Sequence, residues 1–194
     1  MHDSKDLLQK WISEIKAHES PDWNKLPDID LYMDQVIIMM ERQLDIFMRD
    51  AEDKLITRSM INNYVKHGLI APPVNKKYSR SHIAYLMAVC ILKQLLPISD
   101  ITDLMRNQAD KTDIAGLFDL YCEMQDEALH SAADGLTAEI ADLPEDDLDD
   151  HLNMIALKLT VTANANKLAA EKIIHILKSK TKSKTKPLKG SSKK

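Results

Sequence analysis

Apolar residues recur along most of this chain at the three- and four-residue spacing of an amphipathic helix. Leu7, Leu8, Trp11, Ile12 and Ile15 repeat in this way near the N-terminus, and similar stripes follow in later segments. The chain has only four glycines and 5% aromatic residues, and it is rich in residues that favour helices. The sequence therefore predicts a mostly α-helical fold and argues against an all-β one.

Prolines and capping residues divide this pattern into segments. Helices are predicted within 4–18 and over 31–50, 57–67, 80–95, 99–105, 113–132 and 145–178. The Pro72-Pro73 pair cannot continue a helix, so residues 69–78 predict an extended excursion, a small β wing with a turn near Asn75. Four regions are expected: an N-terminal helix and linker (1–25), a domain that carries the wing (26–110), an acidic all-α effector or dimerisation region (111–178) and a disordered Lys-rich tail (179–194).

Charge is sharply segregated along the chain. From Lys54 to Ser99 there are seven Lys and Arg residues and no acid, and from Lys178 to the C-terminus there are eight lysines and no acid. The stretch from Thr112 to Leu157 instead holds thirteen acids and no Lys or Arg. A basic segment of this kind indicates a polyanionic partner, whereas the acidic segment is expected to stay away from one.

The helix predicted at 57–67 has two different faces. Met60, Ile61, Tyr64 and Val65 form a packing face, and the opposite face is polar or basic. Asn pairs bidentately with adenine and Arg with guanine, so the polar face suits the major groove of DNA; the alternative is an ordinary solvated face. Cations on the wing would meet phosphates. Tyr78 is expected to pack the wing against the body, and the alternative is that it stacks on a base. The candidate DNA-binding residues are Lys54, Thr57, Arg58, Ser59, Asn62, Asn63, Lys66, Lys76, Lys77, Tyr78 and Arg80.

These strings resemble a known family. The resemblance rests on Met-Ile-Asn-Asn-Tyr at 60–64, the Gly68-Leu-Ile step, the proline pair and Lys-Lys-Tyr-Ser-Arg at 76–80. Together these strings resemble the winged helix-turn-helix of the MerR regulators. With Leu-Pro-Asp-Ile-Asp-Leu-Tyr at 26–32 upstream, the segment is similar to a MerR-like bacterial group, the domain-of-unknown-function family 1836. The likeness spans about residues 26–105.

The resemblance implies a winged helix-turn-helix at 26–110 and a transcriptional regulator that binds double-stranded DNA. Helix 57–67 would enter the major groove, and wing 71–80 would lie on the backbone. By position, Asn62 stands where the family has an Arg, Asn63 and Tyr64 at its Tyr pair, and Lys77 and Tyr78 in its wing. The chain departs from the family in its longer acidic N-terminal helix, which lacks the usual Ala-x-x-x-Gly-Val turn. The acidic region holds the place of an effector domain, and its ligand is unknown.

The C-terminal helix carries a heptad-like seam. Alternating four- and three-residue spacings join Leu148, Leu152, Ile155, Leu159, Thr162, Asn166, Ala169, Ile173 and Ile176. Such a seam can form a homodimer, which a regulator that reads two half-sites needs, or it can pack on the chain's own core. The Lys-rich tail would add salt-sensitive affinity for DNA, RNA or an anionic membrane surface, so it does not discriminate among them.

No enzyme motif accompanies these features. The sequence contains no glycine-rich phosphate loop and no H-E-x-x-H, C-x-x-C or G-x-S-x-G string, so no catalytic, cofactor or metal site is predicted. Cys90 and Cys122 are expected to be buried free thiols rather than a disulfide or metal pair. No apolar run approaches the roughly 20 residues of a membrane span, and an acidic N-terminus is no secretory signal; a cytoplasmic protein is expected. The competing functions are a helical protein–protein adaptor that keeps the winged-helix fold and a non-specific nucleoid-associated DNA binder.

Overall fold

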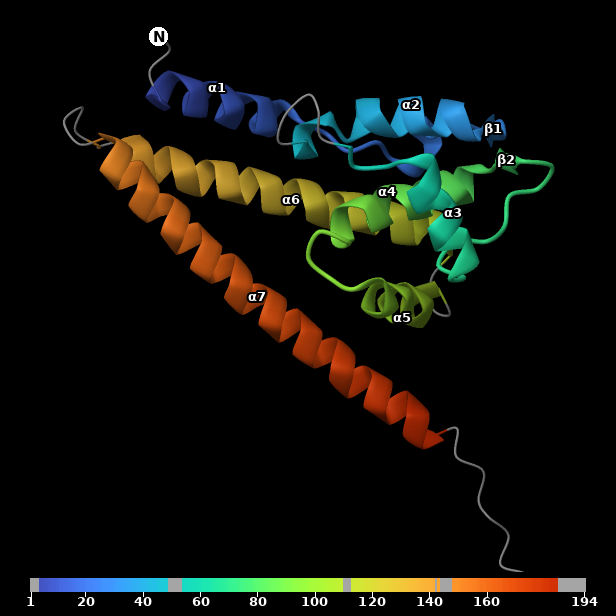
Figure 1. Cartoon of the computed structure of the whole chain (residues 1–194). Coiled ribbons are helices and arrows are strands. Elements are labelled where there is room, and N and C mark those ends of the chain that lie inside the picture. The colour runs from blue at the N-terminus through green and yellow to red at the C-terminus, as the bar shows by residue number, and fades with distance from the viewer. Residues whose placement is uncertain (1–3, 49–53, 110–112, 142, 144–147, 185–194) are drawn as a thin grey trace, which may run out of the picture.

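The computed structural model describes residues 4–48, 54–109, 113–141, 143 and 148–184 (Figure 1). As the sequence predicts, these residues are mostly helical, with one small two-stranded sheet. In chain order the α-helices and strands are α1 (Ser4–Ala17), β1 (Leu31–Tyr32), α2 (Met33–Gln43), α3 (Arg58–Lys66), β2 (Lys77–Tyr78), α4 (Arg80–Leu92), α5 (Ile98–Ala109), α6 (Ile114–Ala141) and α7 (Leu148–Lys184). Short 3₁₀ turns lie at Trp23–Lys25 and Asp45–Phe47.

The sheet joins the wing to a segment far upstream. β2 runs antiparallel to β1, with Leu31 opposite Tyr78 and Tyr32 opposite Lys77. The sequence predicted the turn near Asn75, and a tight turn does lie there: Val74 and Lys77 exchange backbone hydrogen bonds of 3.1 and 2.9 Å. The sequence did not identify β1 as the partner of β2, because strand pairing between distant segments leaves no local signal.

α4 is the centre of the larger core. Seven of its residues are buried, among them Ile83, Leu86, Val89 and Cys90. A helix that is apolar around its whole circumference must be covered on every side. The core around α4 draws side chains from α2, α3 and α6, and it continues past residue 110 through Phe118 and Cys122.

A second, smaller core lies between α1 and α6, which run alongside each other (Figure 1). Ile12 and Ile15 of α1 pack against Ala133, Leu136 and Ile140 of α6. α6 supports this packing because it continues to Ala141, nine residues beyond the end predicted at 132.

Acidic side chains of α6 fasten the linker that follows α1. The carboxylate of Asp126 accepts hydrogen bonds from the backbone N–H and the hydroxyl of Ser20, at 2.9 and 2.7 Å. Asp119 accepts one from the backbone N–H of Trp23 at 2.6 Å. Part of the acidic segment therefore satisfies backbone donors within the fold.

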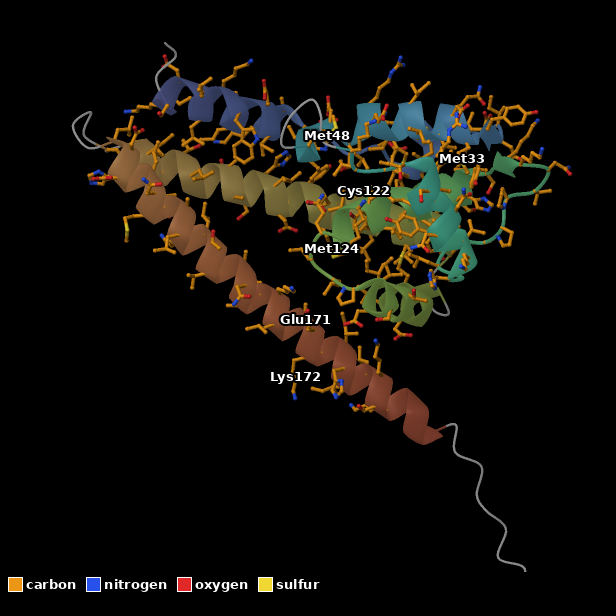
Figure 2. All side chains as sticks on the ribbon, viewed as in Figure 1. Met33, Met48, Cys122, Met124, Glu171 and Lys172 are labelled. Atoms are coloured by element: carbon orange, nitrogen blue, oxygen red, sulfur yellow. The ribbon has the colours of Figure 1, made fainter. Side chains whose placement is uncertain are left out.

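α7 touches the rest of the molecule at its two ends. At the start, Leu148, Leu152 and Ile155 face the chain's own interior, the last two beside the smaller core. Near the other end Ile174 is buried, and Lys178 contacts Asp100 and Asp103 of α5 at 2.8 and 2.9 Å. Lys158 also contacts Glu139 of α6 at 2.6 Å. Beyond it, as far as Ile174, α7 runs as a diagonal arm whose side chains mostly project into solvent (Figures 1 and 2).

Several predicted helix ends were misplaced by a few residues. α2 ends at Gln43 instead of 50, because Leu44 leaves helical geometry and a 3₁₀ turn places Phe47 against His18, with ring centroids 6.1 Å apart. Its N-cap is Tyr32, which lies in β1 and donates its backbone N–H to the side-chain carbonyl of Gln35 at 2.9 Å. α7 continues to Lys184, so the first six residues of the predicted tail are helical. The rest of that tail lies outside the described residues.

Candidate functional site

The outer face of α3 is the main candidate site. Ile61 and Tyr64 are 0% and 2% exposed, and they anchor one side of the helix in the larger core. The opposite side is fully accessible and contains no acid. Its exposed residues are Arg58, Ser59, Asn62, Asn63 and Lys66.

Local signals in the sequence set both ends of α3. The Thr57 hydroxyl accepts the backbone N–H of Met60 at 3.2 Å, which makes Thr57 the N-cap. At the other end Gly68 has φ +68°, and the backbone N–H of Leu69 donates to the Tyr64 carbonyl at 3.0 Å. Only glycine takes this φ at no cost, and the reversal carries Leu69 into the core. Thr57 therefore positions α3 through its hydroxyl.

The wing presents one fully exposed cation at its tip. Asn75 and Lys76 have φ values of +51° and +64°, the pattern of a two-residue hairpin turn, and both side chains are exposed. Lys77 is half-buried, with its Nζ 5.2 Å from the centre of the Tyr32 ring.

Tyr78 does not belong to this surface. The sequence included it among the candidate contacts with packing of the wing as the other interpretation, and its side chain packs: it is only 2% exposed and meets the His82 ring edge-on at 5.7 Å. Burial also raises the pKa of its hydroxyl. The alternation of a strand explains the correction: β2 directs Tyr78 toward the core and Lys77 toward the outside.

Other candidate cations have partners within the chain. An Nη of Arg58 bonds Asp34 of α2 at 2.5 Å, and since both side chains are more than half exposed this ion pair contributes little stability. Nε of Arg80 donates to the Pro27 carbonyl at 3.3 Å, and its guanidinium lies 5.5 Å from the Trp23 ring centre. Arg80 therefore helps to hold the linker as well as to present charge.

Lys93 has a structural role that the sequence did not reveal. Its Nζ donates to the Leu55 carbonyl at 2.5 Å, just before α3, and contacts the Met60 sulfur at 3.6 Å. This contact ties the end of α4 to the segment that leads into α3. Because Leu55 lies far from Lys93 in sequence, the charge pattern could not separate Lys93 from the surface cations.

The structure thus brings together a smaller set than the sequence proposed. Lys54, Arg58, Lys66 and Lys76 are exposed, and α3 and the wing lie at the same end of the molecule, opposite the start of α1 (Figure 1). Ser59, Asn62 and Asn63 belong to the accessible face of α3 as well. Lys77 and Arg80 are partly covered, Thr57 serves as a cap, and Tyr78 is buried.

The two cysteines are separate buried thiols, as the sequence predicted. Burial raises the pKa of Cys90 and of Cys122 to about 12 each, and nearby acids, chiefly Asp126, add to the effect at Cys122. Within the described residues, no three His, Cys, Asp or Glu side chains are grouped so that they could hold a metal ion.

The members of the heptad-like seam in α7 differ in whether they pack against the rest of the chain. Its first three members pack internally, whereas Leu159, Ile173 and Ile176 are 42%, 58% and 43% exposed. A second exposed stripe runs along the middle of α7, and the sequence pattern did not predict it because Asn164 interrupts its apolar spacing. We call it the α7 stripe: Met154, Leu157, Val161 and Leu168.

Residues 21–123, a little over half of the chain, match the model of a protein family described as a domain of unknown function (DUF1836). The match contains β1, β2 and α2 to α5, together with the first part of α6. Comparisons with curated proteins and with solved structures gave no match. No helix in the described part of the chain has both the length and the apolar composition needed to cross a bilayer.

Proposed function

We propose that this chain, which belongs to the DUF1836 family, is a DNA-binding transcriptional regulator with a winged helix-turn-helix of the MerR type. Helix 57–67 would lie in the major groove and wing 71–80 on the phosphate backbone. The observation that carries the proposal is the outer face of α3, with five exposed polar or basic residues and no acid. A solvated helix face ordinarily mixes both signs of charge.

The chemistry of this face suits the edges of DNA bases. Asn62 and Asn63 each offer a donor and an acceptor that match adenine, and Arg58 offers two donors that match guanine. Because Ile61 and Tyr64 are buried, the helix has no freedom to turn these groups away from a bound duplex. Lys66, Lys76 and Lys54 would supply the contacts to phosphate, which position a protein without reading sequence.

We further propose that a second copy of the chain covers the α7 stripe. The stripe repeats at spacings of three, four and seven residues, and its side chains are 55–65% exposed on a helix of 37 residues. α7 begins with Asp149 and Asp150 and ends in a Lys-rich turn. An antiparallel pair that brings the two stripes together is centred on Val161 and places Asp150 opposite Lys172 of the second copy, whereas a parallel pair would place like charges together.

Selection from pooled random duplex DNA at about 150 mM salt tests the regulator. We expect enrichment of a motif with two half-sites. Replacing both Asn62→Ala and Asn63→Ala should relax base preference more than it lowers overall affinity, because each bidentate contact contributes about 1–3 kcal/mol of discrimination. The matched control replaces two exposed asparagines elsewhere, Asn24→Ala and Asn153→Ala, and should behave as the wild type.

Other outcomes point to the competing functions. Binding without enrichment, abolished by deleting residues 179–194, would indicate a non-specific nucleoid-associated protein that binds through its tail. No binding to DNA would indicate an adaptor that uses the basic face for a protein partner. Either result removes the groove assignment.

Sedimentation equilibrium tests the dimer independently of DNA. Leu157→Glu with Val161→Glu should convert a dimer to a monomer, since both side chains lie in the α7 stripe. Ile29→Glu with Ile38→Glu, 66% and 51% exposed outside α7, is the matched control. A wild-type monomer, or a dimer that survives the α7 changes, contradicts the α7 assignment and leaves the DNA test unaffected.

A further inference from the structure

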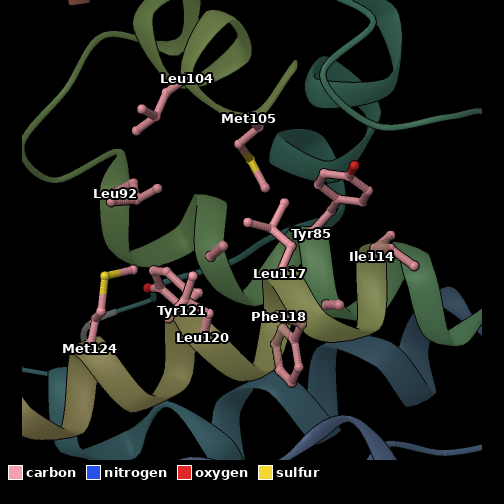
Figure 3. A pocket seen from close by; sticks show the side chains of 12 residues that line it. Tyr85, Leu92, Leu104, Met105, Ile114, Leu117, Phe118, Leu120, Tyr121 and Met124 are labelled. Atoms are coloured by element: carbon pink, nitrogen blue, oxygen red, sulfur yellow. The ribbon is translucent and has the colours of Figure 1, made fainter. Parts of the chain in front are cut away.

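A cavity of about 290 Å³ lies between α4, α5 and α6 (Figure 3). Its wall includes Tyr85 and Leu92 from α4, Leu104 and Met105 from α5, and Phe118 and Tyr121 from α6. The cavity is open to solvent on one side, so it is a hollow in the apolar surface of the helices rather than a sealed void in the core. It is roughly twice the ~150 Å³ of an engineered cavity that admits benzene.

The wall is chemically uniform. Every lining side chain is aliphatic, aromatic or a thioether, and none is charged. Its only side-chain hydrogen-bonding groups are the hydroxyls of Tyr85 and Tyr121, and the Tyr121 hydroxyl already donates to the Gln125 carboxamide at 3.4 Å. A polar molecule would leave its own groups without partners here, and a charged one would lose far more hydration energy.

Two lining residues connect the cavity to solvent. Leu120 and Met124 contribute to the wall, yet they are 49% and 54% exposed. A ligand can therefore enter beside α6 without unfolding the core. The binding sites of small molecules are commonly concave, mostly apolar and already formed in the free protein.

We propose that this cavity binds one uncharged, mostly apolar small molecule, larger than benzene and held by contacts with the aromatic and thioether side chains. The proposal goes beyond DNA binding and does not depend on it.

The chain contains a natural reporter for this site. The Trp23 ring meets Phe118, a lining residue, with centroids 6.4 Å apart and an interplanar angle of 65°. The only other tryptophan is Trp11 on α1. In a Trp11→Phe background, titration with N-phenylnaphthylamine, an uncharged fluorophore that brightens in apolar surroundings, should saturate at one probe per chain. Emission from Trp23 should fall in parallel through energy transfer to the probe.

Two substitutions close the site in different ways. Ala88→Leu adds volume inside the cavity, and Met124→Lys places a charge at its half-exposed edge. Each should weaken probe binding at least tenfold, whereas Ile38→Lys, at an exposed apolar residue of α2 outside the cavity and the α7 stripe, should leave it unchanged. Circular dichroism confirms that each variant is folded, and Met124→Lys retains the test if Ala88→Leu does not fold.

Three results would overturn the proposal. The wild-type chain could fail to bind the probe, or both folded cavity variants could bind it as tightly as the wild type. Loss of binding in Leu157→Glu with Val161→Glu, but not in the cavity variants, would place the probe on the α7 stripe instead. None of these measurements involves DNA, so a failure here is separate from a failure of the proposed regulator.

Discussion

Thr57 fixes the residue at which α3 begins, and its contribution is measurable by itself. Thr57→Ala removes the acceptor for the Met60 N–H, and we expect the free energy of unfolding in urea to fall by about 1 kcal/mol. Thr57→Ser should recover most of the loss. Ser59→Ala, exposed in the same turn, should stay within about 0.5 kcal/mol of the wild type. A Thr57→Ala variant as stable as the wild type would show that α3 does not need this cap.

Tyr78 gives a second prediction at the scale of one side chain. Because its ring is buried against His82, Tyr78→Ala should lower the free energy of unfolding by about 3 kcal/mol or more. Tyr78→Phe keeps the ring and should retain the DNA affinity of the wild type in a fluorescence anisotropy titration. A folded Tyr78→Phe variant with weakened binding would mean that the hydroxyl reaches DNA, contrary to its position in the structure.

In the wing, the effect of turn geometry on stability can be measured separately from the effect of charge on DNA binding. Both Asn75 and Lys76 have positive φ, and Asn-Gly is the pair that suits such a turn best, so Lys76→Gly should preserve or raise stability. Lys76→Val should cost roughly 1 kcal/mol or more, because a β-branched residue resists this conformation. Thermal unfolding of the two variants checks the difference.

Lys76→Gly also tests the electrostatic role of the wing. If the wing lies on the backbone, this variant should bind DNA more weakly and reduce the slope of log affinity against log salt by about 1. Lys10→Ala, an exposed lysine on α1, is the charge-matched control and should leave the slope unchanged. An unaltered slope in Lys76→Gly would place the wing away from phosphate.

The elements also show how far sequence reasoning can reach. The ends of α3 and the wing turn follow from a cap, a C-terminal glycine and an Asn, signals that act within a few residues. The pairing of β1 with β2, the bond between Lys93 and Leu55 and the salt bridge between Arg58 and Asp34 join distant segments, and periodicity carries no information about them. The sequence did not predict the cavity either, since its lining residues have the spacing of ordinary core positions on three separate helices.

For the whole molecule, buried ionisable groups predict loss of stability in alkali. Burial raises the pKa of Cys90, Cys122 and Tyr64 to about 12 each and also raises that of Tyr121. In the unfolded chain these thiols and phenols have pKa values of about 8.5 and 10, respectively. The unfolded chain therefore releases their protons before the folded chain does as the pH rises. The free energy of unfolding should therefore be highest below about pH 8 and fall progressively toward pH 12.

Urea unfolding at about pH 8 and pH 10 checks this slope. Cys90→Ala with Cys122→Ala removes two of these groups and should give a shallower decline than the wild type, even though the variant starts from lower stability. The same decline in both proteins would assign the alkaline loss to other groups. In the native protein at about pH 8, both thiols should resist alkylation, since a buried neutral thiol is a poor nucleophile.

α6 continues without a break past residue 123, where the family match ends. This continuity fixes how the residues after that point are rotated about the helix axis relative to those before it. Residues before that point fill the larger core, and residues after it hold α1 and the start of α7. One residue inserted there would rotate everything beyond it by about 100° and turn the α1-binding face away. Seven inserted residues would restore the direction of that face and lengthen α6 by about 10 Å. Chain length in this helix is thus constrained in whole turns, and relatives that differ here should differ by three, four or seven residues.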